Sequence, residues 1–326
     1  MIVNLFRHTQ AVSVISLLAL CIFFWVGISI QETPINDSSW NPLFKALINP
    51  INNIHPLKEI LTAFLVFWQC LYINKIVVAQ KITSTNSFYP ALFYFILISF
   101  WPGTLTLSSE LLAASFILIA LNKTMSTYLA VNTYSKIFKI GFSLSIASLI
   151  HPPFFVFIPL TWIGMSIFSQ GEMRHWILSL LAITSPWIIF LSFICYCNIP
   201  SIQYDMFFTF LLPDNQSIQF NLINSINLIL LGGLFLISMI ELLRSLNRKN
   251  IKARKSYIFL LWIVVIFSVY NYINPSYIGR KLLILSIPFS IILSNYFYYN
   301  KKSNWLNFVG IVLLSCLFIT HLYLPS

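Results

Sequence analysis

The stretch Arg244–Lys255 reads Arg-Ser-Leu-Asn-Arg-Lys-Asn-Ile-Lys-Ala-Arg-Lys, with six cationic side chains and no acid. Two long apolar runs flank it, Asn221–Met239 before it and Tyr257–Tyr270 after it. Because moving Lys and Arg across a membrane is unfavourable, a basic segment between two apolar runs is typical of a cytoplasmic loop between spans. The stretch therefore predicts a transmembrane helical hairpin and indicates which end of it faces the cytoplasm.

The composition of the whole chain agrees with this reading. Of its 326 residues, 58% are hydrophobic and 8% are charged, whereas a soluble domain carries about 25% charged residues. A soluble core could not cover so much apolar surface, so lipid must cover it. We predict an all-α polytopic membrane bundle that forms a single integral-membrane domain over residues 1–326.

The apolar runs, taken in order, predict about eleven spans with the N-terminus in the cytoplasm. Two pairs are short and are broken by proline, at Trp101-Pro102-Gly103 and at His151-Pro152-Pro153. The predicted spans are Ala11–Ile30, Glu59–Val78, Phe88–Trp101, Leu105–Leu121, Ile137–Ile150, Phe154–Phe168, Trp176–Tyr196, Asn221–Met239, a run from Tyr257 to Asn274, Leu282–Tyr299 and Trp305–Tyr323.

This arrangement separates the charges. It leaves four of the nineteen Lys and Arg residues outside, and it places two of the eight acids inside. Such a bias is the usual signature of orientation in a bacterial inner membrane. The net charge of +11 therefore indicates contact with anionic lipid headgroups and not with nucleic acid.

The cysteines and histidines give no cofactor signal. The five cysteines lie within or at the end of apolar runs, and no CxxC pair or His/Cys spacing typical of a metal site occurs. We predict no cofactor, and the sequence leaves a divalent metal open.

Ionisable residues at membrane depth or at its outer edge are the candidates for function, because burying charge in lipid costs about 3 kcal/mol or more. The predicted topology gathers them on the outer face. They are Glu32, Asp37, Glu110, His151, Asp205, Asp214, Arg280 and Lys281.

Each candidate has a functional and a structural interpretation. Arg280 and Lys281 would bind a lipid phosphate or pyrophosphate, or they would contact ordinary headgroups or an acid such as Asp205. Asp37 or Glu32 would act as a general base toward an acceptor hydroxyl, or both would be solvated loop acids.

Glu110 and His151 have equally ordinary alternatives. Glu110 follows Ser108-Ser109 and suits the positive N-terminal end of a helix. His151 precedes two prolines, which forces an extended backbone, so it fits an interfacial helix cap as well as a ligand-binding role.

The middle of the chain resembles a family of multi-pass inner-membrane proteins of Bacteroidota that has no established activity. The similarity covers roughly residues 1–200. It rests on Phe88-Tyr89-Pro90-Ala91-Leu92 through Trp101-Pro102, Leu118–Lys123, Gly141-Phe142-Ser143, Ala147–Pro153 and the spacing from His175-Trp176 to Pro186.

More distantly, the chain resembles membrane glycosyltransferases of the C type, which use a lipid-phosphate-linked sugar on the non-cytoplasmic face. This resemblance implies a first outer loop at Gln31–Leu57 with Glu32 or Asp37 as base. It also implies a second outer loop at Asn198–Phe220 and a donor phosphate held by Arg280.

Three functions remain open at this stage. The first is a glycosyltransferase-like enzyme of envelope glycan assembly that uses an isoprenoid-phosphate substrate. The second is a non-catalytic subunit that scaffolds an envelope complex. The third is a transporter or flippase, although the sequence lacks the internal repeats and mid-membrane charges common in transporters.

Overall fold

The computed structural model describes residues 6, 11–29, 55–83, 87–100, 107–130, 132–169, 172–197, 222–273, 278–299 and 303–323. These residues form eleven α-helices and two short 3-10 helices. Helices are expected because lipid offers no hydrogen-bond partners to an open backbone. They are α2 (Ala11–Ser29), α4 (His55–Ala79), α5 (Tyr89–Ser99), α6 (Ser109–Met125), α7 (Tyr134–Ile150), η2 (Pro152–Phe157), α8 (Leu160–Phe168), α9 (Met173–Cys197), α11 (Leu222–Ser245), η4 (Leu246–Arg248), α12 (Ile251–Ile273), α13 (Ile278–Tyr299) and α14 (Ser303–Tyr323).

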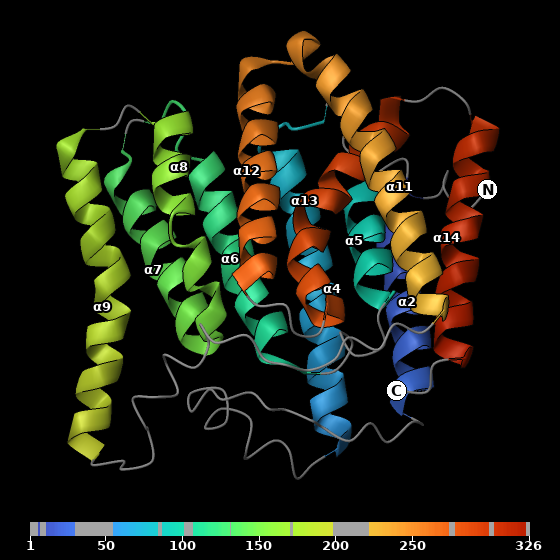
Figure 1. The fold of residues 1–326 in the computed structure, drawn as a ribbon, viewed down its shortest axis with the longest axis horizontal. Helices are drawn as coiled ribbons and strands as arrows, with labels where there is room; N and C mark the ends of the chain where they lie inside the picture. The colour runs from blue at the N-terminus through green and yellow to red at the C-terminus, as the bar shows by residue number, and fades with distance from the viewer. Residues whose placement is uncertain are drawn as a thin grey trace.

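The helices stand side by side in one bundle (Figure 1). Helix α9 lies at one edge, α14 lies near the other, and α12 and α13 lie between them. The hairpin α11–η4–α12 places the residues Arg244–Lys255 at the top of this view. We call this the basic end of the bundle and the other the opposite end.

Five of the described helices are long and apolar enough to cross a membrane. The qualifying stretches are Leu57–Ala79, Met173–Phe193, Ser225–Arg248, Ile251–Tyr272 and Leu282–Tyr299. All five coincide with spans predicted from the sequence.

The prediction of eleven spans is wrong for the described residues. Four further apolar helical stretches fall below that length within the residues whose side chains are described, namely Ala11–Phe24, Tyr89–Ser99, Pro152–Phe168 and Trp305–Phe318. A helix of 11 residues such as α5 rises only about 16 Å, roughly half of the ~30 Å hydrocarbon layer. The two proline-broken pairs are therefore built from segments that do not each cross a bilayer.

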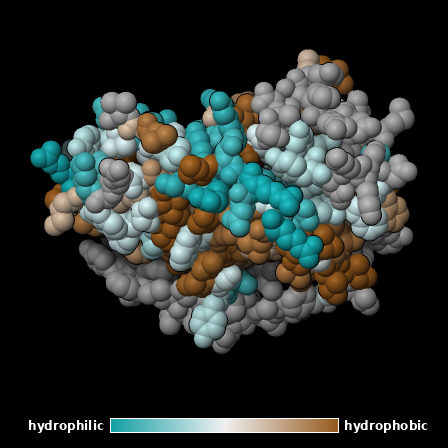
Figure 2. Space-filling view, turned by 90° about the horizontal axis from the view of Figure 1, so that it is seen from above, coloured by the Kyte–Doolittle hydropathy of each residue, from teal (hydrophilic) through white to brown (hydrophobic). Residues whose placement is uncertain are grey.

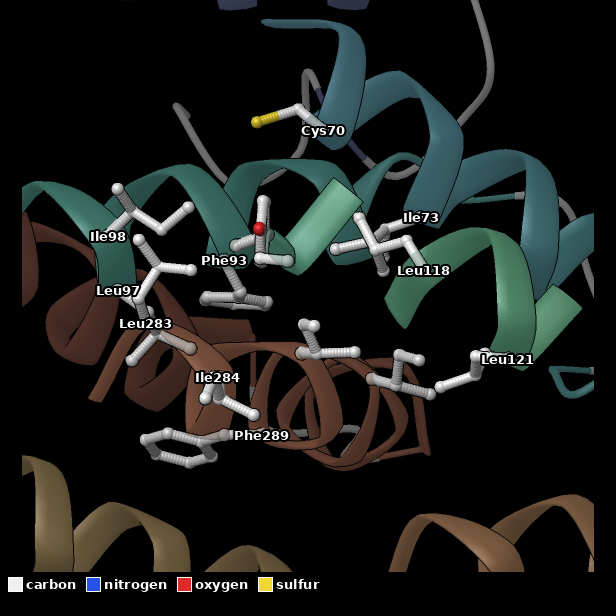
Figure 3. Packing of buried hydrophobic residues seen from close by; sticks show 14 of the residues in the cluster. Cys70, Ile73, Phe93, Leu97, Ile98, Leu118, Leu121, Leu283, Ile284 and Phe289 are labelled. Carbon is white, nitrogen blue, oxygen red and sulfur yellow. The ribbon is translucent and has the colours of Figure 1, made fainter. Parts of the chain in front are cut away.

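The core forms where α5 and α6 pack between α13 and α4 (Figure 3). Helix α13 is the most buried of the five long helices, and all eleven residues of α5 are buried. Phe93 of α5 packs on Phe297 of α13, with ring centroids 4.6 Å apart. A short helix needs such surroundings, because a helix of only a few turns is at best marginally stable in isolation.

Helices α7 and α9 approach closely through small residues. A Cβ added at Gly141 would lie 2.9 Å from Ala182 Cβ and 3.2 Å from the Ser179 carbonyl oxygen. One turn further on, Ser145 Oγ donates a hydrogen bond to the Ile183 carbonyl at 2.6 Å. Small residues spaced four apart, with a hydroxyl bonded across the interface, are the usual means of helix association in lipid.

Candidate functional site

The sequence at the start of α6 fixes two candidate side chains. Ser108 has an extended backbone, and its Oγ accepts a hydrogen bond from the Leu111 N–H at 3.3 Å. This N-cap satisfies one of the free amides at the helix start and places Ser109 and Glu110 in the first turn. A carboxylate there is favoured by the positive end of the helix dipole, as predicted for Glu110.

His151 ends α7, as the sequence predicted. Its backbone is extended, with φ −133° and ψ 97°, and its N–H donates to the Ala147 carbonyl. The two prolines that follow exclude the helical conformation at His151 and open η2 instead. Phe154 of η2 packs edge-on against the imidazole, with ring centroids 4.6 Å apart.

The fold brings these two ends together with α12. Ser109 Oγ lies 3.0 Å from His151 Nδ1 and 3.5 Å from Glu110 Oε2. On the other side of the imidazole, His151 Nε2 lies 3.4 Å from the Tyr270 hydroxyl of α12, a residue only 2% exposed. We call Ser109, Glu110, His151 and Tyr270 the His151 cluster.

The hydrogen-bond donors define one direction through the cluster. If Ser109 donates to the Glu110 carboxylate, its oxygen accepts from Nδ1–H of His151, and Nε2 then accepts from the Tyr270 hydroxyl. The imidazole is neutral in this arrangement and links a phenol to a carboxylate through a serine. In this chain of contacts the serine lies between the carboxylate and the imidazole, whereas in a Ser-His-Asp triad the imidazole lies between the serine and the carboxylate.

The cluster lies at the opposite end from the basic stretch. Tyr270 is 19 residues beyond Ile251, the first residue of α12, and this separation corresponds to about 28 Å of helix. Helix α6 begins at this end of the bundle and α7 finishes there. The structure thus brings Glu110 and His151 together through Ser109, and their predicted role in a site stays a prediction.

The other predicted site residues fall outside what the structure describes. Glu32, Asp37, Asp205 and Asp214 lie in the ranges 30–54 and 198–221, which are not described. The backbone places Arg280 and Lys281 in the first turn of α13, and their side chains are outside the description. Within the described residues, no three His, Cys, Asp or Glu side chains group as they would around a metal ion.

Two members of the cluster, Ser109 and Tyr270, are not predicted from the sequence. Ser109 adjoins Glu110 and could have been proposed from that position alone. Tyr270 ends a long apolar run, and nothing in that run indicates an interaction with a residue 119 positions earlier. Only the packing of α12 against η2 reveals it.

A second polar cluster occupies the basic end. Lys249 Nζ donates to Asn295 Oδ1 of α13 and lies 4.9 Å from the ring centroid of Tyr257 and 4.4 Å from that of Tyr299. The Tyr257 hydroxyl donates to the same Asn295 oxygen at 3.1 Å. Through these contacts, Lys249 at the tip of the basic hairpin and Tyr257 of α12 both bind Asn295 of α13.

Lys249 is expected to make the stability of the protein depend on pH. Burial lowers the pKa of Lys249 from 10.5 to about 8, so the unfolded chain binds more protons than the folded protein between these values. The contribution of Lys249 to the free energy of unfolding should therefore rise as pH increases from about 8 to 10.5. Thermal unfolding of the wild type and of Lys249→Gln across this range measures it. A difference between the two that does not change with pH would contradict the expectation.

The helices and the two clusters define a class, an integral multi-pass membrane protein with a polar site at the end opposite its basic loop. The chain matches, over residues 43–324, a family of unknown function (DUF6427), and it belongs to that family. No curated protein and no solved structure matches it. The resemblance to C-type glycosyltransferases therefore stays a prediction from the sequence.

Proposed function

We propose that this protein is a glycosyltransferase-like enzyme of envelope glycan assembly in a bacterial inner membrane. It would use an isoprenoid-phosphate-linked substrate on the extracytoplasmic face, with the His151 cluster as part of the substrate site. One observation carries the proposal: Glu110 and His151, on separate helices, meet through Ser109 at the end opposite the basic loop. That end is extracytoplasmic if the basic loop is cytoplasmic.

The short connection between α12 and α13 supports one site that contains both the His151 cluster and the cations of α13. Only residues 274–277 separate the end of α12 from the start of α13. Tyr270 and the first-turn residues Arg280 and Lys281 are therefore at the same end of the bundle. Cations there would hold the phosphate of the donor and stabilise it as a leaving group.

The chemistry would be displacement at an anomeric carbon. A carboxylate removes the proton of the acceptor hydroxyl, and Asp37 or Glu32 is the candidate because the resemblance places the base in the first outer loop. The His151 cluster would position the acceptor or the sugar through the Glu110 carboxylate. Both ring nitrogens of His151 are committed to neighbours, so His151 would act by holding Ser109, and through it Glu110, in place.

Single substitutions test the proposal. We expect His151→Ala, Glu110→Gln, Asp37→Asn and Arg280→Gln to lower transfer from a polyprenyl-phosphate-linked sugar, by roughly 100-fold or more where acid–base chemistry is lost. His175→Ala is the matched control. His175 is also a histidine near a helix terminus, and its Nε2 lies 2.9 Å from Thr133 Oγ1 in the connection before α7. This variant should keep wild-type transfer at equal protein level.

Two results would overturn the proposal. One is full activity in all four variants, and that result together with stable co-purification of envelope proteins would favour a scaffolding subunit. The other is a reporter fusion that places residues 276–281 in the cytoplasm, because the phosphate-binding cations would then face the wrong side.

A further inference from the structure

Three lysines from three separate elements converge at the basic end, around the C-terminus of α6. Lys136 Nζ of α7 donates to the carbonyl of Ser126, the residue that follows α6, at 2.7 Å. Lys255 of α12 lies over the ring of Tyr128 in the same turn, which places the start of α12 there too. Lys252 is in the first turn of α12, and the charges of Lys81 and Lys136 both act on it.

The position of Lys81 is fixed by the end of α4. The amides of Lys81 and Ile82 donate to the carbonyls of Val78 and Val77, which is the Schellman arrangement at a helix C-terminus. Lys81 has φ 51°, in the left-handed region where glycine is the usual residue. Next to it, Gln80 Nε2 bonds Asn122 Oδ1 in the last turns of α6 at 3.2 Å.

The local charges are not balanced by the described protein. Helices α7 and α12 both begin here, so two positive helix ends add to the ammonium groups, and neither helix has an acid in its first turn. The negative ends of α4 and α6 oppose these two dipoles, which leaves the three ammonium groups as the unbalanced charge. Among the described residues, none of Lys81, Lys136 and Lys252 forms an ion pair with a carboxylate.

We propose that Lys81, Lys136 and Lys252, with the first amides of α7 and α12, form a binding site for a phosphate group. Cations and helix N-termini are the two elements from which proteins build phosphate sites, and they coincide here. Lys136 and Lys252 are half-buried, so an anion between them would be only partly screened by water.

Figure 2 shows the basic end face on, with hydrophilic side chains forming a band across it. The three lysines lie at this end of the bundle, which adjoins the headgroup region if the basic loop is cytoplasmic. A phosphate there could belong to an anionic lipid or be free in solution. The site is independent of the His151 cluster, which lies at the other end of the bundle.

The test uses the full chain in a non-ionic detergent at constant ionic strength, with the melting temperature as readout. Short-chain phosphatidylglycerol, inorganic phosphate and zwitterionic phosphatidylcholine are titrated separately. We expect a saturable rise with phosphatidylglycerol, with inorganic phosphate, or with both, and none with phosphatidylcholine. A rise with phosphatidylglycerol alone identifies a lipid headgroup, and a rise with both shows that phosphate suffices.

The variant Lys81→Gln/Lys136→Gln/Lys252→Gln should bind the effective ligand roughly 100-fold more weakly, as expected for three cations near an anionic group. The matched control, Lys139→Gln/Arg244→Gln/Arg248→Gln, removes three exposed cations of the same end and should bind like the wild type. If the triple variant does not fold, Lys252→Gln alone should bind about fivefold more weakly. The site is refuted if the wild type shows no saturable response, or if the control loses as much affinity as the cluster variant.

Discussion

Replacing Gly164 by leucine is expected to cause the largest loss of stability of any single substitution proposed for this protein. Gly164 lies in α8, which packs against both α6 and α12. A Cβ added at Gly164 would lie 2.3 Å from Thr124 Cγ2 and 3.3 Å from Phe259 Cε2. Thr124 and Phe259 are each 2% exposed, so neither side chain has free space to move into.

The neighbours of Gly164 are also held in place by their own contacts. Thr124 Oγ1 donates to the Ala120 carbonyl at 2.8 Å, and the Phe259 ring packs edge-on against Phe168. Overpacking a well-filled core costs about 1–3 kcal/mol for added methylenes, and leucine at Gly164 should reach or exceed the upper value. Size-exclusion profile and melting temperature in detergent measure the effect.

The chain supplies a matched control for this substitution. A Cβ at Gly233 of α11 would meet nothing within 4 Å, so Gly233→Leu adds the same atoms without a clash. A compensating variant is also available, because Thr124→Ser removes Cγ2 and keeps the hydroxyl. Gly164→Ala/Thr124→Ser should be more stable than Gly164→Ala. Equal losses for Gly164→Leu and Gly233→Leu would show that the contact is not the cause.

Gln69→Leu is expected to cause the second largest loss. Gln69 is fully buried in α4, and its Nε2 donates to the Leu111 carbonyl and to Ser115 Oγ, both at 2.8 Å. Its Oε1 accepts from the hydroxyl of Tyr94, also fully buried, at 2.9 Å. One side chain thus links α4, α5 and α6.

Leucine has a similar size but removes three hydrogen bonds between buried groups, and it leaves Ser286 as the remaining side-chain partner of the Tyr94 hydroxyl. Each hydrogen bond between membrane helices contributes ~0.6 kcal/mol on average, and a buried polar group that loses its partner costs about 1–3 kcal/mol. Adding Tyr94→Phe removes the hydroxyl that has lost its acceptor, so the double variant should be more stable than Gln69→Leu alone. A double variant whose losses are simply additive would mean that the two side chains are not coupled.

The parts of the fold that could be predicted depend on local signals. The basic stretch Arg244–Lys255 forms the tip of a helical hairpin, as predicted, because both its charge and the flanking apolar runs are local. The predicted loop is shorter than expected, since α11 runs to Ser245 and α12 begins at Ile251. Ser108 caps α6 and His151 ends α7 for the same reason, since an N-cap serine and a residue before proline restrict their own backbone. Half of the His151 cluster could therefore be named in advance.

The predicted number of spans failed because apolar runs do not report helix length. The run Phe88–Trp101 predicts a span, but its helix α5 has 11 residues, and the run Phe154–Phe168 divides into η2 and the nine-residue α8. Both short helices are stabilised by neighbours that come from distant parts of the chain. Hydropathy along a run cannot distinguish that situation from a complete crossing.

The sequence by itself determined that the chain is a helical membrane protein, where its basic hairpin lies, and which residue ends α7. Only the tertiary structure decided which apolar surfaces face protein. Every residue of α5 is buried, whereas Ile177, Leu180 and Leu181 of α9 are exposed. Lipid is as apolar as a leucine side chain, so a helix facing lipid and a helix facing protein have the same composition. The links from Lys249 to Asn295 and from Gln69 to Tyr94 depend on that choice of neighbours, and so does the placement of Tyr270 beside His151.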